Sequence, residues 1–405
     1  MQLNRKIVRN LFQRIENKIR YEFGMLLGRN KIIYSQKPGI KILMIVYYVP
    51  NAIITISQTI KQYRDLSRFS VDILNIAYGF GELSETVLLN YSAIIVHNTA
   101  NSNINQFIKI NEVILKRYKG IKVVMKQDEH FMTQFLINFF EENKIDLVLT
   151  IWPIETAMKV YKSNGKNKNL HLMHFITGYV PDEYRHFTID FENRDIDIGY
   201  RGSLHSPLYG RLASYEKREI GYLFMPYAVK EGLKCDISSK PEDRFIGEKW
   251  LDFLKQCKAV LGVESGSDIV DYTGEVKVQY DRFVAEHPSA TEEEILDFVE
   301  QFKGEITYRA ISPRHFEAAA CGALQILYEG EYQGIFKPYV HYVPLKRDFS
   351  NIEEVISYIK DDVKRKEIVI RAREDIILSG KYSFRKFTEE LDAKLEEIIE
   401  ERGGI

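Results

Sequence analysis

Short apolar runs alternate with amphipathic stretches along the chain from about residue 40. Each apolar run is long enough for one buried strand, and the strands predicted in the first half are residues 41–48, 70–78, 92–98, 121–127 and 146–152. Stretches with helical spacing lie between some of these runs, at residues 54–69, 104–118 and 132–143. Strands that alternate with helices predict a mostly parallel sheet with helices on both faces.

A second α/β unit follows a polar linker at residues 191–197. Its predicted strands are residues 196–202, 220–226, 259–265, 323–329 and 342–346. Residues 268–304 are charged and have helical spacing, so we predict a helical insertion there. The expected fold class is α/β, with two doubly wound Rossmann-like domains, a cleft between them and C-terminal helices. Ligands of such domains bind at the carboxyl ends of the strands.

The expected boundaries follow from this pattern. We place a basic amphipathic helical segment at residues 1–38, an N-terminal Rossmann-like domain at 39–188, a C-terminal Rossmann-like domain at 189–380 and a C-terminal helix at 381–405. The 45% of hydrophobic residues is ample for two cores, and a net charge of −1 does not suggest a nucleic-acid partner.

Cysteine usage and the absence of long apolar runs set the expected compartment. Cys235, Cys257 and Cys321 form no CxxC pair, which argues against a disulfide framework or a zinc site and fits a reducing environment. We find no uncharged apolar run of about 18 residues and no apolar signal-peptide core at the N-terminus. We therefore expect a cytoplasmic protein without a transmembrane helix.

The first 37 residues differ from the rest in charge, with nine Lys/Arg against two Glu. An apolar stripe runs along one side of the predicted helix: Val8, Phe12, Ile15, Ile19, Phe23 and Leu26. A basic amphipathic helix of this kind can lie on an anionic membrane surface, so peripheral association through residues 1–30 is one prediction. The alternative is that the stripe docks onto the N-terminal domain or a partner subunit.

The stretch "ISPRHFEAAACGALQIL", residues 311–327, carries the strongest chemical signal. Ser312 and Pro313 predict a helix N-cap and first position, and the free N–H groups there favour an anion such as a phosphate. Arg314 and His315 add donors, and Glu317 can accept two hydrogen bonds from a ribose diol. The alternative is that Glu317 only favours the helix dipole and that the small residues Ala318, Ala319, Ala320 and Gly322 serve packing.

This stretch, with "NIEEVISYIKDD" and "RAREDI" after it, resembles the C-terminal domain of GT-B glycosyltransferases. The shared core is the pattern (R/G)xFEAxACG, and the similar region is residues 195–380 without the insertion. The resemblance implies that the C-terminal domain binds a nucleotide-sugar, with Glu317 on the ribose, and that the N-terminal domain binds the acceptor. Retaining members often have another glutamate eight residues earlier, where this chain has Arg309.

The resemblance also implies cations early in this domain that neutralise the leaving pyrophosphate without a metal ion. The candidates are Arg201, directly after a predicted strand, with Arg211 and Lys217 on the next helix. Arg211 and Lys217 could equally be solvated surface charges. Glu264 and Ser265 end another predicted strand and are expected to line the same cleft. We predict no metal ligand and no cofactor, because the nucleotide-sugar is a substrate.

Polar residues follow the predicted strand 121–127 at the cleft-facing end of the N-terminal domain. Asp128, Glu129 and His130 are candidates for the base that accepts the acceptor proton, or they only cap the next helix. Weaker candidates for the cleft are His97, Asn98, Thr99, Thr177, Gly178 and Tyr179.

The predicted function is sugar transfer from a nucleotide-sugar to a glycan or lipid-linked acceptor. By analogy the setting is bacterial cell-surface polysaccharide assembly: capsule, O-antigen or lipopolysaccharide. Two alternatives remain open. A sugar-nucleotide 2-epimerase has the same fold and needs no acceptor, and a non-catalytic protein could bind the nucleotide-sugar alone.

Overall fold

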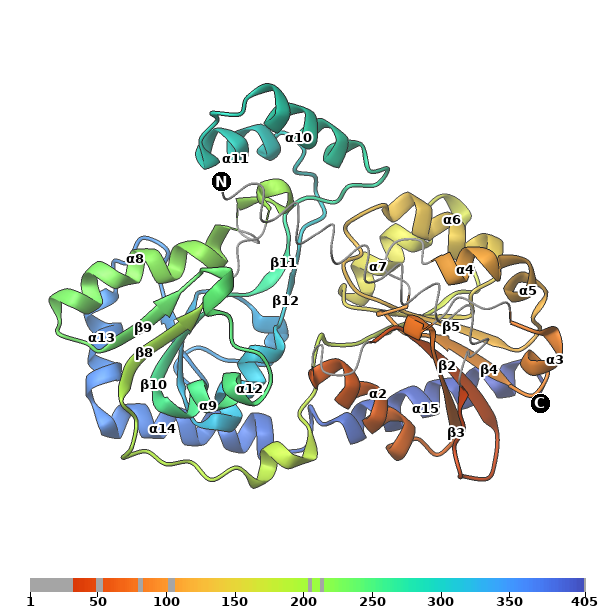
Figure 1. The fold of residues 1–405 in the computed structure, drawn as a ribbon, viewed down its shortest axis with the longest axis horizontal. Coiled ribbons are helices and arrows are strands. Elements are labelled where there is room, and N and C mark those ends of the chain that lie inside the picture. Colours follow the sequence, from red (N-terminus) through yellow and green to blue (C-terminus); the bar gives the residue numbers. More distant parts are fainter. Residues whose placement is uncertain are drawn as a thin grey trace.

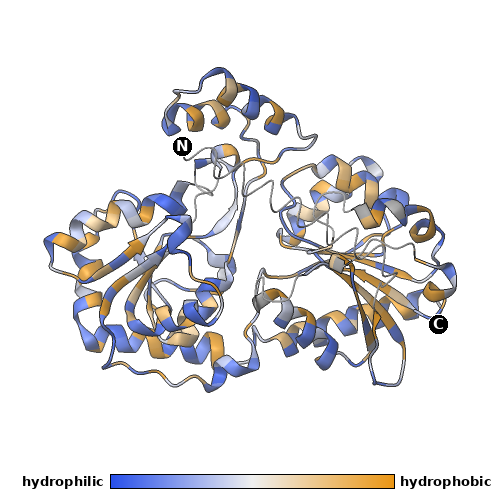
Figure 2. Cartoon of the chain, in the orientation of Figure 1, coloured by the Kyte–Doolittle hydropathy of each residue, from blue (hydrophilic) through white to orange (hydrophobic). Residues whose placement is uncertain are grey.

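The structure is a computed structural model that describes residues 32–48, 54–78, 83–100, 106–202, 206–211 and 215–403. Figure 1 shows two lobes, each with a central sheet, and a pair of helices above them. The strands are predominantly apolar in both lobes, whereas the outer helices carry polar faces (Figure 2). The α/β fold class with two mostly parallel sheets is confirmed.

The N-terminal sheet has, among the described residues, seven strands in the order β1-β3-β2-β4-β5-β6-β7. All neighbours pair in parallel except β1, which pairs antiparallel with β3. The strands are β1 (Ile32–Ile33), β2 (Lys41–Val46), β3 (Ser70–Asn75), β4 (Ala93–Val96), β5 (Ile121–Lys126), β6 (Leu147–Thr150) and β7 (His171–His174). Strands β3 to β6 are buried on both faces, which explains why most of their residues are apolar.

Helices cover both faces of this sheet. They are α2 (Ile54–Leu66), α3 (Glu85–Leu88), α4 (Gln106–Ile110), α5 (Glu112–Arg117), α6 (Thr133–Asn143) and α7 (Ile154–Tyr161). In Figure 1, α4 to α7 lie above the sheet and α2 lies below it. Five of the strands were predicted from the apolar runs, and the structure confirms them.

The C-terminal sheet is parallel, with the order β14-β13-β10-β8-β9. Its strands are β8 (Ile196–Arg201), β9 (Cys235–Ser238), β10 (Cys257–Gly262), β13 (Leu324–Tyr328) and β14 (Val343–Leu345). The helices of this domain are α8 (Glu216–Lys230), α9 (Glu248–Gln256), α12 (Pro313–Cys321), α13 (Ile352–Lys360) and α14 (Asp362–Ala372). Helices α8, α13 and α14 share one core with the sheet, and α9 and α12 pack against it in another.

One prediction for this domain was wrong, and one strand was missed. Residues 220–226 lie within α8 and are not a strand, because Ile220, Phe224 and Ala228 recur at four-residue spacing and bury one helix face. Strand β9 was missed because its four residues include Asp236 and Ser238 and give no apolar run.

The predicted insertion contains two helices, α10 (Glu275–Glu286) and α11 (Glu292–Glu300). They stand on an antiparallel ribbon of β11 (Ser265–Ser267) and β12 (Tyr308–Ala310). The base of the insertion contacts the N-terminal domain, where the Asp271 N–H donates to the His130 carbonyl (2.7 Å) and the Gln134 N–H donates to the Tyr272 carbonyl (2.8 Å). Tyr308 is buried in the N-terminal core, so this ribbon links the two domains.

The chain returns to the N-terminal domain at its C-terminal end. After a π-helical turn at Arg373–Leu378, α15 (Phe384–Glu401) runs beneath the N-terminal sheet beside α2 (Figure 1). Its apolar face joins the N-terminal core through Phe387, Leu391, Leu395, Ile398 and Ile399. We predicted this helix from its spacing, but its return to the first domain was not predicted.

The basic amphipathic segment predicted at residues 1–38 lies mostly outside the described residues, which begin at residue 32. Within the part of the chain that is described, no helix combines the length and apolarity that crossing a membrane requires.

Candidate active site

Three adjoining cavities meet at the N-terminus of α12. We name them the α12 pocket, of about 510 Å³, the Trp250 pocket, of about 650 Å³, and the interdomain pocket, of about 260 Å³. Pro313 lines all three. Gln127 of the N-terminal domain lines both the α12 pocket and the interdomain pocket, so the cavities form one site between the domains.

The start of α12 has the geometry predicted from its sequence. Ser312 is the N-cap, with its hydroxyl accepting from the Arg314 N–H (3.4 Å), and Pro313 is the first helical residue. The ring of His315 completes a capping box with the backbone of Ser312. Ser312, Arg314 and His315 line the α12 pocket, so backbone N–H groups and a guanidinium surround the space where an anion would bind.

Glu317 lies one turn into α12 and is 7% exposed. One of its oxygens accepts from the Trp250 indole N–H (2.7 Å), and the residue lines both the Trp250 pocket and the interdomain pocket. Burial raises the pKa of Glu317, and the Trp250 hydrogen bond opposes part of that rise. The Arg314 guanidinium lies over the Trp250 ring, 5.1 Å from its centre.

Lys217 is the predicted cation that the structure brings into the α12 pocket. No hydrogen bond or ion pair from the described residues reaches its ammonium group. Burial lowers the pKa of Lys217 to about 8, and the positive charge of Arg314 adds to this effect. An unpaired cation beside a helix N-terminus is suited to bind a diphosphate.

The structure places the two predicted arginines elsewhere. Arg201 is buried between the rings of Phe245 and Phe253, and its guanidinium binds the Asp236 carboxylate (2.7 Å). Arg211 forms ion pairs with acidic residues of α11. Both guanidinium groups are thus committed to structural partners, which argues against the predicted role on the pyrophosphate.

Of the two predicted cleft residues after β10, one lines a cavity and the other does not. Ser265 lines the α12 pocket. Glu264 is buried, and its carboxylate accepts a hydrogen bond from the Tyr332 N–H (2.7 Å). Glu264 does not line any of the three cavities. Arg309, at the position of the expected second glutamate, forms an ion pair with Asp268 (2.8 Å).

The three base candidates after β5 have different surroundings. Glu129 is fully buried and accepts from the Thr150 hydroxyl (2.6 Å), the Tyr161 hydroxyl (2.5 Å) and the Ile151 N–H (2.9 Å). Burial raises its pKa to about 7, although these donors oppose the rise. Glu129 is therefore a structural residue of the N-terminal core, and the geometry argues against its prediction as base.

His130 is also buried, at the contact with the insertion. Its Nδ1 lies 2.9 Å from the Tyr308 hydroxyl, and the Tyr209 ring packs edge-on against it. Burial lowers its pKa to about 4, so the ring is neutral at pH 7. These contacts join the domains and leave His130 poorly placed to meet an acceptor.

Asp128 is the exposed member of the three. It follows Gln127, which lines two of the cavities, and its backbone has a left-handed φ of 53°. Such a conformation is uncommon for a residue other than glycine and recurs at functional sites. The Asp128 carboxylate acts across the cleft on Lys217 and opposes part of the lowering of its pKa.

The weaker cleft candidates line the interdomain pocket, with one exception. His97, Asn98, Thr177, Gly178 and Tyr179 line it, whereas the Thr99 hydroxyl accepts from the Tyr47 N–H (3.0 Å). Gly178 lies so close to α12 that a Cβ there would be 2.8 Å from the Pro313 ring, so a side chain would separate the two domains.

Solved structures share this architecture at low sequence identity, which shows the fold alone. Anabaena HepE, crystallised with UDP and glucose, is 12% identical, with 89% of this chain and 100% of that chain covered and a TM-score of 0.50. The DNA-modifying β-glucosyltransferase, solved with and without uridine diphosphoglucose, is 14% identical (88% and 99% covered, TM-score 0.51). Sucrose-phosphate synthase from Thermosynechococcus elongatus is 10% identical (89% and 99% covered, TM-score 0.51).

Residues 246–391, which include α12 and Glu317, match the family described as "Glycosyl transferase-like". The C-terminal domain thus resembles glycosyltransferases in sequence, and the chain as a whole has the GT-B fold of the structures above. No curated protein matches it by sequence.

Sequence reasoning missed several residues that line the three cavities. Trp250 and Arg244 line both the α12 pocket and the Trp250 pocket, and Gln58 and Tyr184 line the interdomain pocket and the Trp250 pocket. Trp250 is one of two tryptophans and lies in the polar stretch "IGEKWLD", which is the one signal that could have drawn attention to it.

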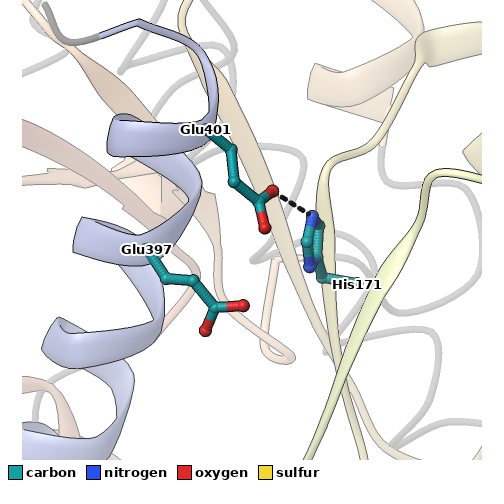
Figure 3. Close-up of side chains that lie close together, drawn as sticks. All are labelled: His171, Glu397 and Glu401. Carbon is teal, nitrogen blue, oxygen red and sulfur yellow. Dashed lines mark ion pairs between the residues drawn. The ribbon is translucent and has the colours of Figure 1, made fainter.

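A separate group of potential metal ligands lies away from the cavities. His171, Glu397 and Glu401 have ligand atoms within 4.8 Å of one another, and the His171 Nε2 is 3.1 Å from Glu401 (Figure 3). His171 begins β7, so this group is at the amino end of the strands, opposite the cleft. It joins α15 to the sheet edge and has no place in the transfer site.

Proposed function

We propose that the protein is a glycosyltransferase that binds a nucleoside diphosphate sugar at the N-terminus of α12 and transfers the sugar to a hydroxyl acceptor in the interdomain pocket. One observation carries the proposal: three cavities meet at Pro313, and they are lined by Lys217 in one and by Glu317 in the other two. The Lys217 ammonium has no ion-pair partner among the described residues. UDP-glucose is the first donor to test, because two proteins of similar fold were solved with UDP, glucose or uridine diphosphoglucose.

The donor is proposed to place its diphosphate in the α12 pocket. The backbone N–H groups of the first helical turn, Arg314 and Lys217 supply the positive charge that the departing diphosphate needs. Its ribose lies in the Trp250 pocket, where Glu317 accepts hydrogen bonds from the diol. The Trp250 indole already binds one Glu317 oxygen, which fixes the direction of the carboxylate.

The acceptor is proposed to enter the interdomain pocket and to react with inversion at the sugar carbon. Its hydroxyl oxygen forms a bond to the anomeric carbon while the bond from that carbon to the diphosphate oxygen breaks. The electron pair leaves with the diphosphate, and the hydroxyl proton goes to the Asp128 carboxylate. Arg309 supports inversion, because retaining GT-B glycosyltransferases often have a glutamate at this position.

The biological setting is proposed from the family resemblance. We propose bacterial cell-surface polysaccharide assembly with a glycan or lipid-linked acceptor. Peripheral attachment to an anionic membrane through residues 1–30 would suit a lipid-linked acceptor, and salt-sensitive sedimentation with anionic liposomes that disappears on deletion of residues 1–30 would test it.

The proposal is tested by a donor screen followed by product analysis. Thermal-shift measurements against UDP-, GDP-, CMP- and dTDP-sugars should show stabilisation by one nucleotide class, because a ligand that binds only the folded state stabilises it. Incubation of that donor with candidate acceptors should then release the nucleoside diphosphate and form a glycoside. Formation of an isomeric nucleotide-sugar without a glycoside would instead identify a 2-epimerase.

A further inference from the structure

The N-terminal domain has a second cavity, on the face of the sheet away from the interdomain pocket. This cavity, which we name the α4–α6 pocket, measures about 330 Å³. Its walls are largely apolar and include Val96, Val124, Ile108, Phe135 and Phe139. Figure 1 shows α4, α5 and α6 on this side of the sheet. The volume is at the lower end of the range for small-molecule sites, about 300–1,000 Å³.

Lys126 is the one lysine of β5 that lines this pocket. Alternate residues of a strand face opposite sides of the sheet, and Val124 and Lys126 line the α4–α6 pocket whereas Met125 lines the interdomain pocket. The two cavities are therefore separated by the sheet. A ligand in one does not occupy the other.

The ammonium group of Lys126 is buried and has no close partner among the described residues. The residue is 3% exposed, and no hydrogen bond or ion pair from the described residues reaches its ammonium group. The charges of Glu129 and Asp128 act on it from a distance. Both Glu129 oxygens already accept hydrogen bonds from three other donors, and Asp128 is exposed to solvent. Burial lowers the pKa of Lys126. A buried and unpaired cation in an apolar cavity is costly, unless a ligand supplies the anion.

Charges at the rim are consistent with an anionic ligand. Glu112 is paired with Lys116 at 2.6 Å, and Glu142 lies 3.8 Å from the same ammonium. Lys109 also lines the pocket and is exposed. Lys116 and Lys109 together balance the two acidic charges at the rim, whereas no described residue pairs with Lys126.

We propose that the α4–α6 pocket binds an anionic amphiphile, with a hydrocarbon chain of roughly eight carbons among the phenylalanines and a phosphate or carboxylate on Lys126. This site is independent of the proposed donor and acceptor positions. The chemistry of the head group distinguishes the two possible classes of ligand, an alkyl phosphate and a fatty acid.

Calorimetry with octyl phosphate, octanoate and 1-octanol tests the proposal on the full chain. We expect octyl phosphate or octanoate to bind more tightly than 1-octanol, and the tighter anion identifies the head group. Lys126→Met should weaken binding of that anion by at least about tenfold and leave 1-octanol within about twofold. The matched control is Lys122→Met, because Lys122 is buried on the same face of β5 but does not line the pocket.

A second variant tests the site without touching the buried charge. Phe135 is 37% exposed, so Phe135→Ala should fold normally and weaken all three ligands together. The proposal is overturned if neither anion binds at millimolar concentration, if Lys126→Met binds the anion as the parent does, or if 1-octanol binds equally well. Equal binding of inorganic phosphate would also overturn it, because the site would then hold a free anion only.

Discussion

At the scale of single residues, Glu317 has the best defined role in the proposed donor site. Glu317→Ala should reduce the affinity for the nucleotide donor by about 2–4 kcal/mol, because it removes a charged acceptor from the ribose and leaves the Trp250 indole N–H without its partner. Calorimetry measures this loss. The control is Glu248→Ala, which removes an exposed carboxylate that lines the same pocket. Equal losses in the two variants would contradict a specific ribose contact.

Lys217 gives the donor site a predicted pH dependence. Its pKa is lowered to about 8, so the ammonium loses its charge as the pH rises through that value in the free protein. Donor affinity should therefore be highest below pH 8 and fall towards pH 9. Lys217→Arg keeps the charge and should flatten this fall, whereas Lys217→Met should lose about 1.5–3 kcal/mol at pH 7. A parent protein with the same pH profile as Lys217→Arg would show that Lys217 does not hold the diphosphate.

Asp128 and Glu129 are neighbours for which the structure predicts opposite phenotypes. Asp128→Asn should reduce turnover by about 10²–10⁴-fold with little change in melting temperature, because the side chain is exposed and asparagine tolerates the left-handed backbone. Glu129→Ala should lower the free energy of unfolding by about 2–5 kcal/mol, since three buried donors lose their acceptor. Its turnover per folded molecule should stay near that of the parent. The reverse pattern would assign the base to Glu129.

At the scale of elements, α15 ties the end of the chain to the first domain. Asp392 accepts from the Tyr63 hydroxyl (3.2 Å), the Ser67 hydroxyl (2.8 Å) and the Arg68 N–H (2.8 Å). Asp392→Ala should lower the free energy of unfolding by about 2–4 kcal/mol and leave donor affinity unchanged. Denaturant melts measure the first effect. The exposed pair of Arg68 and Glu396 offers a control, and Glu396→Ala should cost at most about 1 kcal/mol.

Elements with strong local signals could be predicted from the sequence. Serine and proline predicted the start of α12 correctly, and the motif placed Glu317 one turn inside the helix. The left-handed Gly322 that ends the helix had been interpreted only as a small packing residue. Buried parallel strands were recognisable as apolar runs. Residues 220–226 misled the prediction because a short apolar run fits a strand as well as a buried helix face.

The direction of long charged side chains could not be predicted in this way. Arg201 is turned away from the cleft by Phe245, Phe253 and Asp236, which are 35 or more residues distant in the chain. Arg211 and Lys217 had similar local sequence contexts, yet α11 of the insertion pairs with Arg211, whereas no described residue pairs with the Lys217 ammonium. Such contacts depend on tertiary structure, and the same holds for the burial of Glu129.

At the scale of the whole molecule, two domains are joined by more than one connection. The chain crosses from the first domain to the second and returns with α15, and the ribbon of the insertion places Tyr308 in the N-terminal core. The close approach of Gly178 to Pro313 adds a contact beside the cavities. This arrangement holds residues of both domains, Gln127 and Lys217 among them, around one site.

The most direct test of the donor site is the crystal structure of the full chain with UDP, grown in the presence of EDTA. We predict the diphosphate against the first turn of α12 and the Lys217 ammonium, and the ribose hydroxyls on the Glu317 carboxylate, without a divalent cation. Binding of UDP at another place, or binding only after a divalent metal ion is restored, would contradict the account.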